Sequence, residues 1–431
     1  MFRSTFIACI RALSSLNNKN MKNLIISLFF CLPCKAQLFK IVKDRAVQST
    51  ANVIGDGIDK AIKKSAGKAI EDRMNGNQTA STGVYTKYDF VPGDSILYAT
   101  DFVLDNVGEL PAGWNSSSNG VVVESTSPAG KWLQLNQGIF LAGIQNNTFG
   151  KNYSVEFDVL LDVTSKSGYY LPPIYYGALG SGKLEATNNV FLKEPHVNNA
   201  FEFKIEPKEN IPSVFTLKSF EEGRETFNSE SKRLEFFAGT LRKVAHYAIS
   251  VQNTRLRMWI NEVKVIDVPK AVNVHVPINQ LYFKTENTGG FGEGSYRYLI
   301  SNLKVATGFR DNRSKLISEG KLVTTGILFD VNSAEIKPQS YAVIKEIATI
   351  LKEHGDLKIS IIGHTDADGN ADANLVLSEK RAAAIKDFLA KEFAIDGSRL
   401  TTVGKGASQP IADNKTSTGK AANRRVEFVK L

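Results

Sequence analysis

The sequence predicts a chain of several domains, in which an antiparallel β-sandwich is followed by a smaller α/β domain. The 431 residues are enough for two or three domains, each with its own hydrophobic core. Apolar and polar residues alternate with a period of two over residues 84–307, as they do in half-buried strands. After Gly308 strand-like and helix-like segments alternate along the chain instead, which is typical of an α/β or α+β domain.

The chain begins with a pattern typical of an export signal. A short basic start, Met21–Asn23, precedes the apolar run Leu24–Pro33 and the small-x-small site Cys34–Ala36. Cleavage after Ala36 would remove residues 1–36 and leave a periplasmic or outer-membrane-associated protein. A retained membrane anchor is the alternative, although a membrane-spanning helix needs about 20 apolar residues and this run is shorter.

Cysteine usage and charge exclude several classes of protein. All three cysteines precede residue 37, so the mature protein would have no disulfide, thiol nucleophile or cysteine metal site. The five histidines show no paired spacing, and we expect no metal and no cofactor. Removal of the five basic residues within 1–36 would lower the formal net charge from +9 to +4, which does not favour nucleic acid as a partner.

Residues 37–83 are predicted to form an amphipathic helix and a linker. Apolar side chains recur at steps of three and four between residues 38 and 74, and the polar face is basic. Such a helix binds a membrane surface or associates with a second copy of itself. The alternative is a spacer helix that packs on its own protein. Residues 75–83 are small and polar, as in linkers.

Residues 84–307 carry the strand pattern. In the clearest run, Val155, Phe157 and Val159 alternate with Glu156 and Asp158. Similar short runs follow, separated by turns rich in Gly, Asn, Pro and Ser. Many short strands without intervening helices predict an antiparallel β-sandwich.

The segment Thr254–Pro269, a strand, a turn and a second strand, resembles strands of the concanavalin-like and laminin-G-like jelly rolls. That resemblance implies a fold that often binds or cleaves sugars. A retaining glycosidase needs two carboxylates about 5 Å apart on one face. Glu156 and Asp158 have the required spacing, but they lie opposite the apolar set, as on the outer face of any sandwich strand. The three tryptophans can stack on sugars or fill the core. A carbohydrate-binding or carbohydrate-active sandwich remains the alternative to a structural one.

A membrane barrel is a further alternative for residues 84–307. The strands of a membrane barrel need about ten alternating residues with an apolar outward face. The runs here are shorter, and charges such as Arg255, Arg257 and Glu262 interrupt them. The pattern therefore favours a sandwich over an outer-membrane barrel.

Residues 309–431 predict the α/β domain. The expected strands are Leu322–Phe329, Leu357–Ile362, Leu400–Val403 and Val426–Leu431, and the expected helices are Pro338–His354 and Asn374–Phe393. Proline near the first turn suits the start of the first helix.

This part of the chain resembles the OmpA-like domains. Ile327–Ile336 is similar to the first characteristic block of that family, Gly363–Asp366 with the later Arg381-Ala382 to the second, and Asn423–Glu427 to the end. The resemblance covers about a quarter of the chain. It implies non-covalent binding of peptidoglycan, without catalysis, through the diaminopimelate of the stem peptides.

The same resemblance implies roles for individual residues. Asp366 would hold the ammonium of the ligand and Arg381 its carboxylate, while Asn332, Asn374 and Arg425 would line the site. Arg381 lies four residues from the apolar Leu377, so its planar guanidinium sits in or beside the buried stripe, where an anionic partner is needed. The alternative is that these side chains pair with each other, or with Glu379 and Asp387, in surface ion pairs worth about 0–1 kcal/mol.

Two other interpretations of the loop after the second predicted strand, a calcium site and a catalytic histidine, are less favoured. Asp366, Asp368 and Asp372 suggest a calcium loop, but the remaining ligand pattern is missing. His364 has no nearby serine or cysteine nucleophile in the sequence, so we expect a structural hydrogen-bonding role. The sequence therefore predicts a non-enzymatic envelope protein whose last domain anchors the sandwich to peptidoglycan, with outer-membrane association compatible with that role.

Overall fold

The computed structural model describes residues 88–145, 148–163, 171–286, 296–309 and 311–431. These residues belong to one compact unit, Gly83–Leu431. The predicted leader, 1–36, and the predicted helix and linker, 37–83, lie outside the described residues. Among the helices that the structure describes, none combines the length and apolar character needed to cross a membrane.

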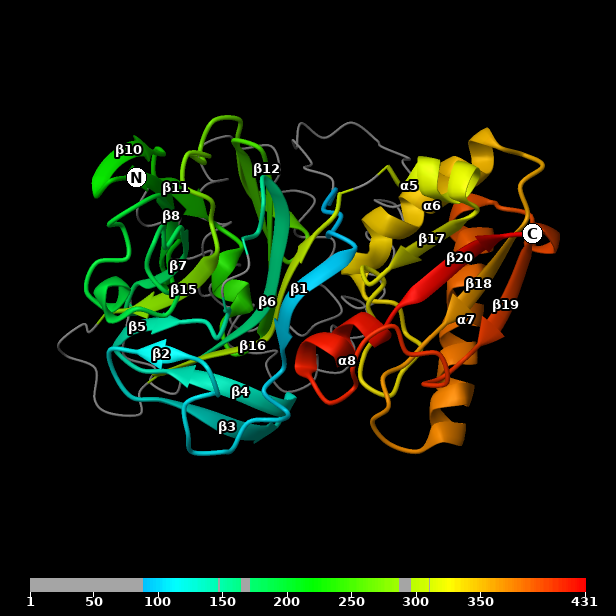
Figure 1. Ribbon diagram of the computed structural model, residues 1–431, viewed down its shortest axis with the longest axis horizontal. Coiled ribbons are helices and arrows are strands. Elements are labelled where there is room, and N and C mark those ends of the chain that lie inside the picture. The colour runs from blue at the N-terminus through cyan, green and yellow to red at the C-terminus, as the bar shows by residue number, and fades with distance from the viewer. Residues whose placement is uncertain (1–87, 146–147, 164–170, 287–295, 310) are drawn as a thin grey trace, which may run out of the picture. The chain divides into compact units, whose positions relative to one another are not determined.

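Two eight-stranded antiparallel sheets form the first part of the unit (Figure 1). The first sheet has the order β14-β13-β12-β6-β16-β4-β3, with β1 also paired to β16. Its strands are β1 (Ser95–Thr100), β3 (Gly120–Thr126), β4 (Ala129–Leu135), β6 (Asn152–Val163), β12 (Val244–Gln252), β13 (Arg255–Ile260), β14 (Val263–Val268) and β16 (Tyr296–Thr307).

The second sheet has the order β10-β9-β8-β7-β15-β5-β2, with β11 also paired to β9. Its strands are β2 (Asn115–Ser116), β5 (Gly138–Leu141), β7 (Ile174–Leu179), β8 (Ala200–Glu206), β9 (Ser213–Glu221), β10 (Arg224–Asn228), β11 (Lys232–Leu234) and β15 (Gln280–Thr285). The short helices η2 (Asn189–Leu192) and η3 (Phe237–Thr240) lie in its connections. We call the two sheets together the two-sheet domain.

One hydrophobic core joins the two sheets. Phe157 of β6 contacts the rings of Tyr176 on β7 and Phe283 on β15, with centroids 5.0 Å and 5.5 Å apart. The alternating apolar residues of the sequence point into this core, which confirms the prediction of antiparallel sheets in this region. Trp114, Trp132 and Trp259 are buried, as expected for core residues.

The second part of the unit, the C-terminal domain, has a four-stranded sheet of order β17-β20-β18-β19. Only the β18–β19 pair is parallel. Its strands are β17 (Lys321–Thr324), β18 (Ile359–Gly363), β19 (Leu400–Gly404) and β20 (Val426–Lys430). Its helices are α5 (Asn312–Ser314), η4 (Lys315–Glu319), η5 (Pro338–Ser340), α6 (Tyr341–Glu353), α7 (Ala371–Phe393), η6 (Gly397–Arg399) and α8 (Ser417–Asn423). The first predicted strand ends at Thr324, well before Phe329, and the second predicted helix begins at Ala371, before Asn374.

Helices α6 and α7 pack on one face of this sheet (Figure 1). Helix α7 begins at Ala371 because the side chain of Asn370 accepts a hydrogen bond from the backbone N–H of Ala373. Gly363, at the end of β18, lets the strand approach α7 closely: a Cβ at this position would lie 2.3 Å from the carbonyl oxygen of Ser378. The loop that follows β18 is thereby held beside α7.

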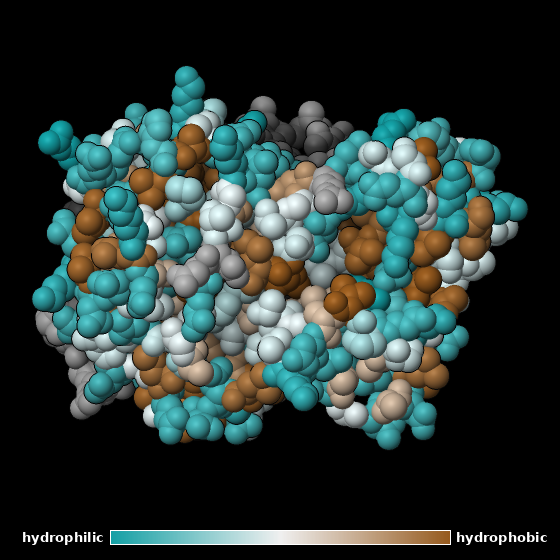
Figure 2. Space-filling model, in the orientation of Figure 1, coloured by the Kyte–Doolittle hydropathy of each residue, from teal (hydrophilic) through white to brown (hydrophobic). Residues whose placement is uncertain are grey.

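The two domains touch at several points within the unit. The backbone N–H of Ala99 on β1 donates to Oγ1 of Thr418 on α8 at 3.0 Å. Trp259 packs with Tyr88 and Phe90 and belongs to the same buried cluster as Ala342 of α6. On the face of the molecule shown in Figure 2, hydrophobic residues occur in separate groups among hydrophilic ones. Scattered groups of this kind are ordinary for a protein surface.

Candidate ligand-binding site

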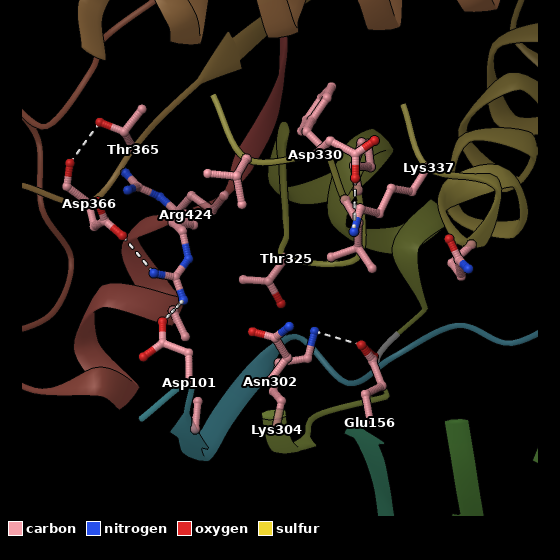
Figure 3. A pocket seen from close by; sticks show the side chains of 18 of the residues that line it. Asp101, Glu156, Asn302, Lys304, Thr325, Asp330, Lys337, Thr365, Asp366 and Arg424 are labelled. Atoms are coloured by element: carbon pink, nitrogen blue, oxygen red, sulfur yellow. Dashed lines mark hydrogen bonds and ion pairs between the residues drawn. The ribbon is translucent and has the colours of Figure 1, made fainter. Parts of the chain in front are cut away.

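A cavity of about 720 Å³ is lined by all five residues predicted to bind a ligand. The C-terminal domain lines it with the segment 327–332, the loop after β18, α7 and the end of α8. The two-sheet domain lines it with residues of β1, β6, β12 and β16. Figure 3 shows side chains from both domains around this one pocket.

Asp366 lies in the loop after β18 and is buried. Its Oδ2 accepts a hydrogen bond from Nη1 of Arg424 at 2.6 Å, and its Oδ1 accepts one from the backbone N–H of Asp368 at 3.2 Å. Nη2 of Arg424 lies 3.6 Å from Oδ2 of Asp101, which follows β1 in the two-sheet domain. Arg424 therefore stands between two carboxylates, one from each domain (Figure 3).

Arg381 projects from α7 toward the segment that precedes η5. Its Nε donates to the carbonyl oxygen of Ser333 at 2.9 Å and its Nη2 to that of Asp330 at 3.3 Å. The guanidinium carbon lies 4.9 Å from the centre of the Phe329 ring. Burial lowers the pKa of Arg381, an effect that nearby Asp366 opposes. Within the described part of the chain, no carboxylate forms an ion pair with Arg381.

The surface pairing considered from the sequence is not what the structure shows. Asp366 pairs with Arg424, and Arg381 contacts backbone carbonyls and an aromatic ring. Asp366 and Arg381 nevertheless line the same cavity. The arrangement places an anion and an unneutralised cation within reach of one bound molecule.

Asn332 and Asn374 also line the cavity. Asn374, in the first turns of α7, donates from Nδ2 to the carbonyl oxygen of Asp368 at 2.8 Å and to that of Asp366 at 3.4 Å. It therefore holds the loop that carries Asp366. Asn332 is exposed and has a φ of +54°, a left-handed conformation that asparagine adopts more readily than most residues.

Arg425 also lines the cavity, and its charge is neutralised within the domain by Glu427. Its Nε and Nη2 lie 2.9 Å and 2.7 Å from Oε1 of Glu427, and Nη2 also donates to the carbonyl oxygen of Gln409 at 3.1 Å. The preceding residue, Arg424, reaches Asp366 instead. The sequence contained a signal for this difference: in an extended segment Arg425 and Glu427 share one face, while Arg424 points to the other.

His364 is buried beside the same pair, with Nε2 3.5 Å from Oε1 of Glu427. Neither ring nitrogen has a hydrogen-bond partner, so the expected hydrogen-bonding role was wrong. Burial, reinforced by the charge of Arg425, lowers the pKa of His364 to about 4. The ring is therefore neutral at neutral pH and packs as a structural side chain.

Two of the three acidic residues considered for a calcium loop have other partners. Asp366 pairs with Arg424, and Asp368 pairs with Nζ of Lys420 at 2.8 Å. No group of His, Cys, Asp or Glu among the residues that the structure describes has an arrangement suited to a metal ion. The charged and amide side chains that line the cavity can recognise a ligand by charge and hydrogen bonds.

Residues 328–424 match the OmpA family. This segment is an OmpA-like domain. It includes Asp366, Arg381 and Arg424, and the resemblance drawn from the sequence motifs is confirmed.

Several known proteins are similar to this domain. Outer membrane porin F of Pseudomonas aeruginosa is 40% identical over 116 residues, which make up 27% of this chain and 33% of the porin. The peptidoglycan-binding protein ArfA of Mycobacterium tuberculosis is 39% identical over 108 residues, 25% of this chain and 33% of ArfA. The solved peptidoglycan-associated lipoprotein from Burkholderia pseudomallei is 30% identical with a TM-score of 0.23, covering 24% of this chain and 88% of that one. The chain thus spans about a third of the length of these two curated relatives.

Proposed function

We propose that the OmpA-like domain binds peptidoglycan non-covalently through the diaminopimelate of its stem peptides, and so anchors an exported two-sheet domain in the cell envelope. The observation that carries this proposal is Arg381, a half-buried cation that has no carboxylate partner among the described residues and stands near Asp366. An unpaired guanidinium in such a place is costly unless an anion meets it. A ligand carboxylate is the anion that would remove this cost.

The geometry of the two residues suits a zwitterionic amino-acid end group. Arginine presents a planar fork that binds a carboxylate through two parallel hydrogen bonds. Two of the Arg381 nitrogens are fixed by the carbonyls of Ser333 and Asp330, which orients the fork before the ligand arrives. Asp366 supplies the negative charge for the ligand ammonium. Its carboxylate can accept further hydrogen bonds beside the one from Arg424, because an ionised carboxylate has about four acceptor sites.

The relatives support peptidoglycan as the partner. ArfA is named a peptidoglycan-binding protein, and the Burkholderia protein is named a peptidoglycan-associated lipoprotein. Porin F is named for the outer membrane. We extend peptidoglycan binding and an envelope location, periplasmic or associated with the outer membrane, to this chain on the strength of its OmpA-like domain.

A non-enzymatic role is part of the proposal. The two carboxylates of β6 that have glycosidase-like spacing are both engaged: Glu156 with Lys304 at 2.9 Å, and Asp158 with His246 at 2.8 Å. A glycosidase needs one free acid and one free nucleophile or base. The jelly-roll relation of the two-sheet domain belongs to the same proposal and is supported by its two antiparallel sheets.

Co-sedimentation with isolated peptidoglycan tests the proposal. The mature chain is compared with its Asp366→Ala and Arg381→Ala variants, and folding is checked by circular dichroism. We expect the wild type to sediment and both variants to remain in solution. Arg313→Ala is a matched control, because it removes an arginine of the same part of the chain that pairs with Glu353 on the surface. A wild type that stays in solution, or variants that sediment as well as Arg313→Ala, would refute the proposal.

A further inference from the structure

The two-sheet domain contributes a strongly polar surface to the cavity of Asp366 and Arg381. We call this surface the sheet wall. It consists of Glu156 and Asp158 on β6, His246 on β12, and Asn302 and Lys304 on β16. Figure 3 shows Glu156, Asn302 and Lys304 around the same pocket as Asp366 and Arg424.

The charges of the sheet wall are buried to an unusual degree for the outer face of a sheet. The side chains of Glu156 and Lys304 are 5% and 12% exposed. Asp162 and Arg297 form an equivalent cross-strand pair on the same two strands, and their side chains are 24% and 50% exposed. Burial of charges costs free energy that a single ion pair often fails to recover. The difference between the two pairs is their place: only the first lines the cavity.

Two polar atoms of the sheet wall are buried without a hydrogen-bond partner in the described structure. They are Oε1 of Glu156 and Nε2 of His246. Oε1 of Glu156 can only accept, while Nδ1 of His246 is engaged by Asp158, which leaves Nε2 for another group. Burial opposes protonation of His246, but the hydrogen bond and charge of Asp158 raise its pKa, so that Nε2 can carry a proton. A buried polar atom without a partner can form a hydrogen bond with a ligand or a water molecule that reaches it.

The cavity is also larger than a diaminopimelate end group requires. Pockets of about 300–1,000 Å³ hold drug-sized ligands, and this one measures about 720 Å³. Space therefore remains beside Asp366 and Arg381 for the residues attached to the diaminopimelate.

We propose that the sheet wall binds the stem peptide next to the diaminopimelate, so that both domains share one peptidoglycan site. This inference rests on the proposed function and adds a second binding surface to it. Glu156 accepts a hydrogen bond from a peptide N–H, and His246 donates one to a peptide carbonyl or carboxylate. Asn302 and Lys304 supply further donors at the same surface.

The chemistry of the wall favours peptide over glycan. Phe329 is the one Phe, Tyr or Trp among the described residues that line the cavity, and the guanidinium of Arg381 already stacks on its ring. Aromatic faces that would stack on a sugar are therefore missing from this lining, while charged and amide groups that match a peptide are abundant.

Contacts between the domains hold the wall in place. Arg424 bonds Asp366 and also approaches Asp101, which follows β1. The bond from Ala99 to Thr418 joins β1 to α8 beside it. Strand β1 pairs with β16, the strand of Asn302 and Lys304. A short, hydrogen-bonded route thus connects the ammonium-binding end of the site to the sheet wall.

The test compares two probes on the full mature chain by isothermal titration: free diaminopimelic acid, and a synthetic stem peptide that contains diaminopimelate. The wall variant is Glu156→Gln with Lys304→Met, which removes both charges together and leaves neither unpaired. The control is Asp162→Asn with Arg297→Met, the equivalent pair outside the cavity. Asn302→Gly is a second wall variant that keeps the left-handed backbone (φ +52°) of a bulge and removes only the amide.

We expect the wild type to bind the stem peptide more tightly than diaminopimelic acid. The wall variant should weaken stem-peptide binding by at least about tenfold, the loss of one or more hydrogen bonds to charged groups, and leave diaminopimelic acid binding unchanged. Asn302→Gly should act in the same direction and the control should match the wild type.

Any of three results would overturn the inference. The first is equal binding of both probes by the wild type, and the second is binding of the stem peptide by the wall variants as tight as that of the control. The third is an equal loss of both probes by the wall variants. If neither probe binds the wild type, the proposed function fails together with the inference. Asp366→Ala separates the two ideas, because it should abolish binding of both probes whether or not the wall takes part.

Discussion

Two clusters of charges in the C-terminal domain differ in one respect that explains their roles. In the first, Arg425 and Glu427 pair with side chains 2% and 7% exposed, and Lys321 completes the set by bonding the other oxygen of Glu427 at 2.8 Å. In the second, Arg424 bonds Asp366 at 2.6 Å, while Arg381 has no carboxylate partner among the described residues. We call them the closed cluster and the open cluster.

The comparison separates charges that stabilise a fold from charges that await a ligand. Each charged residue of the closed cluster has an oppositely charged partner inside the domain, so removing Arg425 or Glu427 takes the partner away from a buried charge. In the open cluster, no described residue provides a carboxylate partner for Arg381. Arg424 and Arg425 are adjacent in the chain, yet they fall on different sides of this division.

The largest effect on stability should come from the closed cluster. Arg425→Ala leaves Glu427 buried without its main partner and should lower the free energy of unfolding by about 3–5 kcal/mol, measured by urea denaturation. Arg424→Ala, whose side chain is 40% exposed, should cost about 1 kcal/mol or less. Equal losses in the two variants would remove the distinction between the clusters.

The open cluster should respond in binding and not in stability. Arg381→Lys keeps the charge but loses the planar fork that binds a carboxylate through two hydrogen bonds. We expect peptidoglycan affinity to fall by roughly tenfold to a hundredfold, because this is the contribution of one hydrogen bond to a charged group. The free energy of unfolding should change by less than about 1 kcal/mol. Retention of full affinity would show that the fork geometry is not used.

A pH titration sharpens the comparison further. The pKa of His364 lies at about 4 in the folded protein, below its ordinary value of 6.5, because it is buried next to Arg425. The unfolded chain therefore binds a proton between these two pH values and the folded chain does not. Stability should fall by about 1–2 kcal/mol as the pH drops from 6.5 to 4.

His364→Asn is the control for this titration, since other groups also ionise in that range. The variant should lose less stability than the wild type between pH 6.5 and pH 4, as measured by thermal unfolding. Parallel pH profiles for the two proteins would mean that His364 does not carry the effect.

The smallest effect is expected at the loop of Asp366. Asn374→Ala removes the bond that holds the carbonyl of Asp368, and with it part of the support for Asp366. One such hydrogen bond is worth about 1 kcal/mol, so peptidoglycan affinity should fall by roughly fivefold. An unchanged affinity would show that the loop keeps its shape without Asn374.

The sequence alone determined much of this protein. The period of two along β6 predicted a buried face and an exposed face, because successive side chains of a strand point in opposite directions. The motif residues predicted the OmpA-like domain and brought Asp366 and Arg381 to one site. Spacing along α7 also predicted a partly buried guanidinium at Arg381.

Only the tertiary structure decided which charges are paired. Asp366 meets Arg424, 58 residues away, and Arg424 approaches Asp101 of the other domain. No local pattern marks such partners, because an ion pair depends on distances of a few ångströms that the packing of distant segments sets. The same holds for Glu156: the strand pattern assigns it to the outer face of the sandwich, and the contact between the domains brings it, with Lys304, into the cavity of the site.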